Sequence, residues 1–213
     1  MLRWSDKRLA LSLVLAIAVL APGTLPGMAQ SKAAISETSP AKALGSKTAP
    51  IVMEVFSDFQ CPACRELYQQ TLRPVIENYV SANKVYLVHR DMPLPVHKYA
   101  RDAARYANAA ARLGKFEKVV AALYGKQDRW SADGNIEAAV AEVLTPAEMK
   151  KVREMLRDGK LDAAIDRDVS LGNMVPVRQT PTMIITHRGK TERFVGWVSY
   201  AILRLYLEDL LRQ

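Results

Sequence analysis

The chain has 213 residues, of which 49% are hydrophobic and 7% aromatic, enough apolar side chains for the packed core of one large domain. Its formal net charge is +8, but the basic residues are scattered and often alternate with acids, as in Lys115–Lys118. The sequence has no long basic block interleaved with aromatic residues, so the composition argues against a nucleic-acid-binding protein.

The N-terminus has the pattern of an export signal. Three basic residues within the first eight precede a short apolar run over residues 9–21, and Gly27-Met28-Ala29 resembles a small-residue cleavage site. The run is shorter than the ~20 residues that a membrane-spanning helix needs. We therefore expect residues 1–29 to be a signal peptide, with an uncleaved N-terminal anchor as the alternative. In both cases the working domain lies outside the cytoplasm.

Residues 30–50 are rich in Ala, Ser, Lys, Thr and Pro without an apolar period, which is typical of a flexible linker. The apolar run at residues 51–56 predicts a central strand that is covered on both faces. A helix is expected from about residue 63 to 79, and Pro74 should kink or divide it. Residues 84–89 predict a second strand, which prolines at 93 and 95 end.

Residues 97–174 predict a block of helices. Alanines recur at helical spacing from Ala100 to Ala111, and small side chains there favour close helix packing. Trp130–Asn135 is expected to be a loop. Thr145, followed by Pro146 and by Glu148 at the third helical position, has the pattern of a capped helix start.

After the helical block, residues 182–186 and 192–195 predict a hairpin whose turn contains Gly189. Ser199 can cap a final helix. The order of elements predicts an α/β sheet domain, built from residues 51–96 and 175–213, with a helical insertion at 97–174.

The two cysteines carry the clearest chemical signal. Cys61 and Cys64 are separated by Pro62-Ala63 and lie between the first strand and a helix. The positive end of the helix dipole and unpaired backbone N–H groups favour a thiolate at this position. Thiolate is the form that attacks disulfides, and an oxidising compartment lets a disulfide persist. The pattern therefore indicates thiol–disulfide exchange.

Two other interpretations of the cysteine pair are weaker. A purely structural disulfide would close a very small loop and so would add little stability. Tetrahedral zinc needs two further ligands, and the three histidines lack the spacing of a zinc finger. We expect no metal site.

Acidic residues near the cysteines need explanation. Glu54 lies in the middle of the apolar strand, where a buried charge needs a partner, a water path or a raised pKa. An exposed strand edge is the alternative. Asp58 adjoins the cysteines, and a carboxylate so close would raise the pKa of the thiol. His89 and Arg90 are expected to be a surface pair.

Three segments resemble one family. They are Glu54–Cys64, the Val88–Leu94 segment with the alanine-rich helix that follows, and Thr180-Pro181-Thr182 before a strand. Together they resemble the thioredoxin fold with a helical insertion, specifically the DsbA-like disulfide oxidoreductases of the BdbD-like branch, over about residues 50–213. One departure is Pro-Ala between the cysteines, where the familiar strong oxidants carry Pro-His.

The resemblance implies a role for each site residue. Cys61 would be the exposed nucleophile and Cys64 the buried resolving thiol. Pro181 would be a cis-proline facing the cysteines, and the backbone of Thr180 would pair with a bound peptide. Glu54 would help to move protons at the resolving thiol.

The resemblance also implies a function. We expect an exported enzyme that introduces disulfides into reduced or unfolded secreted proteins and uses no cofactor beyond its own redox-active disulfide. A membrane quinone-linked oxidase of the DsbB or VKOR type would reoxidise it. The location would be periplasmic or otherwise extracytoplasmic, with membrane attachment only if the signal stays uncleaved. The alternatives are a reductase or isomerase of the same fold, or a non-catalytic peptide-binding chaperone.

Overall fold

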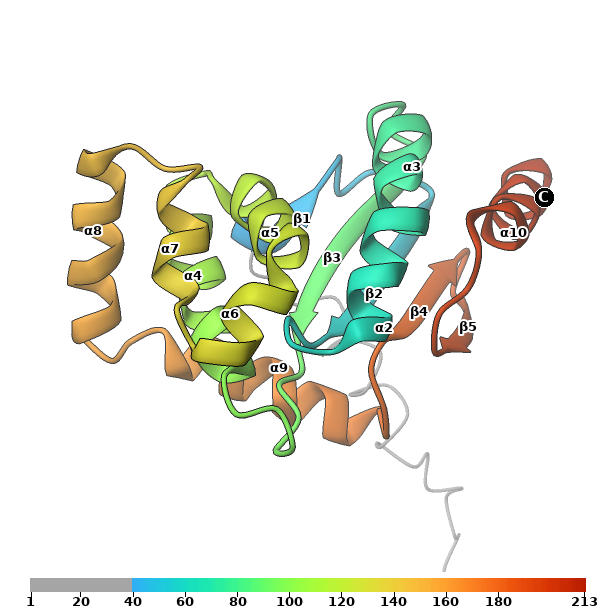
Figure 1. Cartoon of the computed structure of the whole chain (residues 1–213). Coiled ribbons are helices and arrows are strands. Elements are labelled where there is room, and N and C mark those ends of the chain that lie inside the picture. The colour runs from blue at the N-terminus through green and yellow to red at the C-terminus, as the bar shows by residue number, and fades with distance from the viewer. Residues whose placement is uncertain (1–39) are drawn as a thin grey trace, which may run out of the picture.

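The computed structural model describes residues 40–213, so the expected signal peptide and residues 30–39 lie outside the described residues. In the described part, five strands form one sheet in the order β1-β3-β2-β4-β5 (Figure 1). The parallel pair is β2 and β3, and the other neighbours are antiparallel. The strands are β1 (Ala43–Leu44), β2 (Ile51–Ser57), β3 (Val85–Asp91), β4 (Thr182–His187) and β5 (Lys190–Val195).

The central strand β2 is covered on both faces, as its apolar run predicts. Each residue of β2 except Val52 is buried. Alternation sends Met53, Val55 and Ser57 to one face of the sheet and Glu54 and Phe56 to the other. Met53 and Val55 pack in the same apolar cluster as Cys61 and Cys64, whereas Phe56 belongs to a separate cluster on the opposite face.

The helix after Cys61 contains the interruption that Pro74 predicts. A proline ring clashes with the carbonyl four residues earlier and supplies no N–H to the helix. The chain meets this with wider π turns on both sides of a short α segment, so the helix continues without a break. Its parts are α2 (Pro62–Leu67), η2 (Tyr68–Leu72), α3 (Arg73–Val75) and η3 (Ile76–Val80).

The helical insertion lies between β3 and β4. Most of it gathers beside β3, toward the edge of the sheet that β1 forms, and α9 crosses below the strands (Figure 1). The alanine stripe of α4 is buried, in agreement with its predicted packing role. The helices are α4 (Ala100–Arg112), α5 (Phe116–Gly125), α6 (Gln127–Asp133), α7 (Ile136–Ala141), α8 (Pro146–Arg157) and α9 (Asp162–Met174).

The loop expected at residues 130–135 is wrong for most of its length, because α6 runs to Asp133. The Trp130 side chain is 1% exposed, and its indole N–H donates to the Leu123 carbonyl at 2.7 Å, which fixes this short helix against α5. Gly134 then ends the helix with a φ of 78°, a left-handed conformation that glycine adopts without strain.

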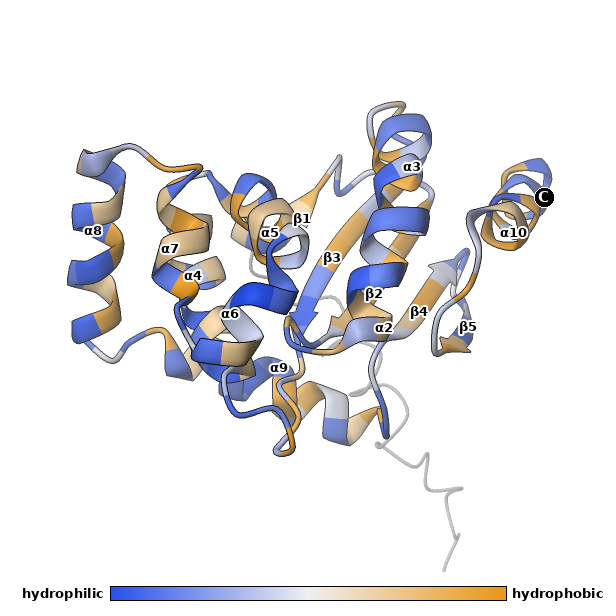
Figure 2. Cartoon of the chain, viewed as in Figure 1, coloured by the Kyte–Doolittle hydropathy of each residue, from blue (hydrophilic) through white to orange (hydrophobic). Residues whose placement is uncertain are grey.

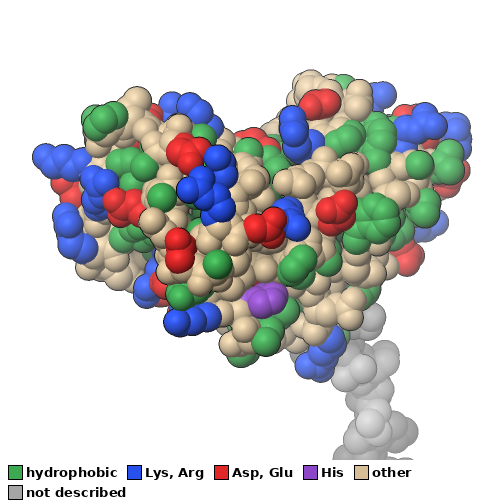
Figure 3. Space-filling model, in the orientation of Figure 1, with side chains coloured by type: hydrophobic (Ala, Val, Ile, Leu, Met, Phe, Trp, Pro, Cys, Tyr) green, Lys and Arg blue, Asp and Glu red, His purple; other side chains and the backbone are tan. Residues whose placement is uncertain are grey.

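The C-terminal part follows the prediction closely. The hairpin of β4 and β5 leads to α10 (Tyr200–Arg212), whose first turn is capped by the Ser199 hydroxyl. Apolar residues colour the central strands, and the helices carry mixed apolar and polar faces (Figure 2). On the face seen in Figure 3, acidic and basic side chains lie interspersed over both halves of the molecule. Within residues 40–213, no helix combines the length and the apolar character that a membrane crossing requires.

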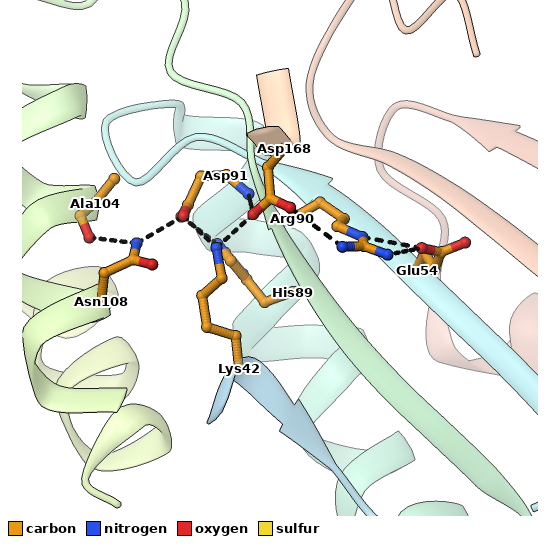
Figure 4. A network of polar contacts seen from close by, with 8 residues as sticks. All are labelled: Lys42, Glu54, His89, Arg90, Asp91, Ala104, Asn108 and Asp168. Carbon is orange, nitrogen blue, oxygen red and sulfur yellow. Dashed lines mark hydrogen bonds and ion pairs between the residues drawn. The ribbon is translucent and has the colours of Figure 1, made fainter. Parts of the chain in front are cut away.

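The end of the predicted linker needs correction, because residues 40–50 are part of the fold. A short 3-10 turn, η1 (Pro40–Lys42), leads into β1, which pairs with β3. Lys42 is 3% exposed and forms ion pairs with Asp91 and Asp168 (Figure 4). A lysine in a sequence of linker composition therefore anchors the edge strand in a buried charged network.

Candidate active site

Cys61 and Cys64 occupy the first turn of α2, directly after the loop that leaves β2. Cys61 is the N-cap residue, with extended backbone angles, and Pro62 takes the first helical position, where no N–H is required. Both thiols are free. Cys61 is 7% exposed and Cys64 is 1% exposed, so both thiols are buried and the expectation of an exposed Cys61 is wrong; Cys61 is the less buried of the two.

The surroundings of Cys61 stabilise its thiolate. The largest cause is a hydrogen bond from the Cys64 thiol, supported by the side chain of Thr180 and by backbone N–H groups of Ala63 and Cys64. Burial opposes these contacts, and the net result lowers the pKa of Cys61 from 9.0 to about 6. Cys61 is therefore the thiol that ionises near neutral pH.

Cys64 has the opposite character. Burial is the largest cause that raises its pKa well above 9.0, and the neighbouring Cys61 adds to the effect. Two groups work against this rise. The backbone N–H of Asp58 donates to the Cys64 sulfur at 3.4 Å, and the Ser57 hydroxyl also hydrogen-bonds it. The pair therefore consists of one acidic thiol and one thiol that holds its proton.

The Asp58 carboxylate is engaged elsewhere, which removes the conflict that its sequence position suggests. It is buried, and Oδ1 accepts from the backbone N–H of Gln60 at 2.7 Å. Oδ2 accepts from the backbone N–H of Leu94 at 2.8 Å and from His97 Nδ1 at 2.7 Å. What Asp58 presents to the cysteines is its N–H, which favours a thiolate.

The helical insertion holds the loop before Cys61. The Gln127 side chain, at the start of α6, donates to the carbonyls of Phe59 and Cys61 at 2.7 and 3.0 Å. The Gln60 side chain accepts from the backbone N–H of Tyr99 at 2.7 Å. The sequence did not identify these contacts. The sequence offers no local signal for Gln127, because its partners lie 68 and 66 positions away.

Thr180, which directly precedes Pro181, lies against Cys61. The peptide bond between Thr180 and Pro181 is cis. The Cys61 thiol donates to the Thr180 carbonyl at 3.5 Å, and the Gly196 N–H donates to the Pro181 carbonyl at 2.8 Å. Four chain segments thus meet at Cys61: the β2 loop, the α2 N-terminus, the residues before β4 and the start of α6.

Glu54 lies elsewhere in the fold. It is fully buried, and Arg90 donates to its Oε1 from Nε at 2.9 Å and from Nη2 at 2.6 Å (Figure 4). Burial is the largest cause that raises its pKa to about 7. Since strand alternation turns Glu54 away from the face that carries Val55 and Ser57, the structure does not bring it together with Cys64. The exposed-edge alternative is wrong, and so is the expected surface location of Arg90, which is 2% exposed.

The His, Cys, Asp and Glu side chains of residues 40–213 form no group of three or more that is arranged to hold a metal ion. The polar side chains of Asp58, Gln60 and Gln127 beside the cysteines are instead hydrogen-bonded to the protein.

Comparisons with known proteins agree with this geometry. The family model described as Thioredoxin matches residues 37–194. A probable disulfide bond formation protein D of Bacillus cereus is 23% identical over 196 residues, which cover 85% of this chain and 89% of that protein. The Na(+)/H(+) antiporter NhaA 3 of Salinispora tropica is 31% identical over 150 residues, 68% of this chain, but the match spans only 21% of the antiporter.

Solved structures show the same fold. A variant of alpha-DsbA1 from Wolbachia pipientis aligns with a TM-score of 0.73 and 18% identity, covering 84% of this chain and 95% of that one. Oxidised BdbD from Bacillus subtilis aligns with a TM-score of 0.68 and 17% identity, covering 81% of this chain and 93% of that one. The helical insertion within a thioredoxin-like sheet is therefore shared.

Proposed function

Because the chain belongs to the thioredoxin family and is a thiol–disulfide oxidoreductase of the DsbA type, we propose that it is an exported oxidase that introduces disulfides into secreted proteins. The observation that carries the proposal is the contrast between the two thiols. The pKa of Cys61 is lowered to about 6, whereas burial raises that of Cys64 well above 9.0. A stabilised thiolate at Cys61 favours the reduced protein, so the disulfide form readily gives up its oxidising equivalents.

The proposed cycle starts from the Cys61–Cys64 disulfide. A substrate thiolate attacks the Cys61 sulfur, the bond to Cys64 breaks, and a mixed disulfide forms. A second substrate thiolate then attacks the substrate sulfur of that mixed disulfide, which releases an oxidised substrate and leaves both cysteines reduced. Cys61 serves as the attacked sulfur because it is the less buried of the pair.

Thr180 and Pro181 are proposed to position the substrate. The strand β4 begins immediately after them, and the Thr180 carbonyl lies 3.5 Å from the Cys61 sulfur. An extended peptide that pairs with the backbone of Thr180 would bring its own cysteine to Cys61 by strand addition. Trp197 directly follows Gly196, whose N–H donates to the Pro181 carbonyl. Its side chain is 48% exposed and therefore available to an apolar substrate.

Export and reoxidation complete the proposal. The N-terminal signal pattern supports an extracytoplasmic location, with membrane attachment only if the signal is not cleaved. The similarity to the disulfide bond formation protein D supports a role with protein substrates. A membrane quinone-linked oxidase of the DsbB or VKOR type would restore the Cys61–Cys64 disulfide.

The test is oxidation of a reduced, denatured protein such as ribonuclease A by the full chain in its disulfide form. We expect substrate thiols to disappear as the chain becomes reduced. Cys61→Ser and Cys64→Ser both lack the internal disulfide, so each should abolish the reaction; Cys64→Ser treated with glutathione disulfide should instead hold a mixed disulfide at Cys61. A chain that instead reduces insulin disulfides faster than it oxidises ribonuclease would be a reductase. Substrate binding that survives Cys61→Ser without any exchange by the wild type would indicate a chaperone.

A further inference from the structure

The resolving thiol, Cys64, must lose and regain a proton, and the contacts described around Cys61 include no group that takes this proton up. Cys64 is 1% exposed, so bulk water does not reach its sulfur easily. Its proton must nevertheless leave whenever Cys64 attacks a mixed disulfide at Cys61, and must return whenever Cys64 is expelled from the internal disulfide. Because burial holds the thiol in its neutral form, a nearby group has to accept that proton.

Two hydroxyl groups lie beside the Cys64 sulfur. The Ser57 hydroxyl hydrogen-bonds Cys64, and its Oγ lies 2.8 Å from the Tyr124 hydroxyl of α5. Each hydroxyl can donate and accept at once, so the pair can pass a proton along without becoming charged. Tyr124 is 2% exposed, and its ring stacks on Tyr68 with centroids 5.1 Å apart. The pair is therefore fixed in place and sheltered from solvent.

A small cavity continues from these hydroxyls to one carboxyl group. Its volume is about 30 Å³, and its lining includes Ser57, Tyr124, Tyr68 and Glu117. A cavity needs roughly 10–15 Å³ to admit a water molecule, so this cavity is large enough for one or two waters. The Tyr68 hydroxyl donates to Glu117 Oε1 at 2.6 Å, which orients the carboxylate at the cavity wall.

We propose that Glu117 holds the proton that Cys64 releases and returns, with Ser57, Tyr124 and water in the cavity as the connection. This inference rests on the proposed disulfide exchange and adds a residue to it. Glu117 does not touch the reacting sulfurs. It acts on Cys64 through Ser57, Tyr124 and water, and is therefore a positioning residue.

Bonds, electrons and the proton balance in both directions of the exchange. When Cys64 attacks a mixed disulfide, the Cys64–Cys61 bond forms and the bond from Cys61 to the substrate sulfur breaks. The cysteine pair is oxidised, the substrate leaves as a thiolate, and the Cys64 proton moves to the Glu117 carboxylate. In the oxidase direction a substrate thiolate breaks the internal disulfide, and Cys64 leaves with the electron pair and takes the proton back from Glu117.

The charge environment suits Glu117 to this role. Burial is the largest cause that raises its pKa, and the Tyr68 hydrogen bond, His89 and Arg73 oppose that rise. Other polar groups that face the same cavity are Lys42 from η1, Ser57 from β2 and Tyr124 from α5. None of the ion pairs within residues 40–213 includes Glu117, whereas Glu54 is paired with Arg90 on the other face of the sheet. Glu117 can therefore change its charge at a lower cost.

His89 also lines the cavity, but it is engaged on two sides. Its Nε2 lies 3.2 Å from Asp91 Oδ1, and its ring stacks on Phe59 at a centroid distance of 5.0 Å. The Nε2 atom of His89 is therefore directed at Asp91. Glu117 keeps its carboxylate at the wall of the cavity that Ser57 and Tyr124 also line.

The experiment separates the two chemical steps in the full chain. The reduced protein is mixed with glutathione disulfide, quenched in acid at set times and analysed by mass spectrometry for the mixed disulfide and the internal disulfide. In the wild type we expect resolution of the mixed disulfide to show a pH inflection from Glu117. In Glu117→Gln, resolution should slow at least about tenfold and lose that inflection, since general-base assistance is worth about that or more. Formation of the mixed disulfide should keep its rate.

Two further variants make the result decisive. Tyr124→Phe keeps Glu117 but breaks the connection, so it should slow resolution in the same way. Glu142→Gln makes the same chemical change at a surface residue paired with Lys126, and it should behave as the wild type. A Glu117→Gln protein that resolves at the wild-type rate with the inflection intact overturns the assignment of Glu117. A wild type that forms no mixed disulfide at all overturns the proposed function instead.

Discussion

Two polar regions of one fold are built differently: one is buried, and the other includes the half-buried Glu117. The charged network of Lys42, Glu54, Arg90, Asp91 and Asp168 alternates cations and carboxylates (Figure 4). The second region, the hydroxyl chain, is neutral: the hydroxyls of Ser57 and Tyr124 share a hydrogen bond beside a cavity, and on the lining of that cavity the Tyr68 hydroxyl donates to the carboxylate of Glu117. In the network each charge is fixed by an opposite charge, so it joins η1, β2, β3 and α9. Among the described residues no cation pairs with Glu117, which leaves a proton there able to move.

The largest expected effect breaks the charged network. Asp168 accepts from Lys42, from Arg90 and from the backbone N–H of Asp91. Asp168→Asn leaves two buried cations with one fewer carboxylate, so we expect a loss of about 3–5 kcal/mol in the free energy of unfolding. Urea unfolding measures it. Asp166→Asn on the same helix removes only an exposed ion pair with Arg101, and it should cost less than ~1 kcal/mol.

For the folded fraction, Asp168→Asn should leave the rate of mixed-disulfide formation at Cys61 unchanged. If exchange slows in proportion to the lost stability, the two regions are not independent and the comparison fails.

A second, smaller effect concerns Glu54, whose pKa is raised from 4.5 to about 7. The folded state then binds more protons than the unfolded chain between these values, so stability falls as pH rises from about 4.5 to 7. Glu54→Gln should remove that slope, which amounts to at most ~3 kcal/mol at ~1.4 kcal/mol per pKa unit. Unfolding midpoints across that pH range provide the measurement.

The same variant tests the proton role that the resemblance gives to Glu54. Resolution by Cys64 should keep its rate and pH profile in Glu54→Gln if the hydroxyl chain carries the proton. Slow resolution in this variant, combined with normal resolution in Glu117→Gln, would return the role to Glu54.

The smallest effect on stability concerns the hydroxyl chain. Tyr124→Phe removes the bond to Ser57 and should cost about 1 kcal/mol, the usual net value of a neutral hydrogen bond. Tyr106→Phe is the matched control, because it removes a tyrosine hydroxyl that donates to Glu137 inside the insertion. Similar losses of stability with slow resolution in Tyr124→Phe alone would separate the chemical role from the structural one. Equal resolution rates in both would argue against the chain.

Local signals predicted much of the fold. The capping box at Thr145 and Glu148 and the cap at Ser199 are present, because capping depends on residues close in sequence. The apolar run of β2 and the cysteines at the start of α2 were also predicted from neighbouring residues.

Long-range contacts account for what the sequence did not indicate. His97 hydrogen-bonds Asp58 across 39 positions, and Tyr124 reaches Ser57 across 67. Neither pairing follows from a local period. Lys42 lies in a segment of linker composition, so only its buried partners on β3 and α9 reveal its role. The apolar neighbours of Glu54 do not show which face of the sheet it lies on. That follows only from the register of β2 in the folded sheet.

The most direct test of the central claim is the redox equilibrium of the full chain with glutathione at pH 7. We propose that Cys61, with a pKa of about 6, favours the reduced form and makes the disulfide an oxidant. Thioredoxin at about −270 mV and DsbA at about −120 mV bracket the range of this fold. We predict a reduction potential in the half of that range nearer to DsbA. A value at the thioredoxin end would contradict the account.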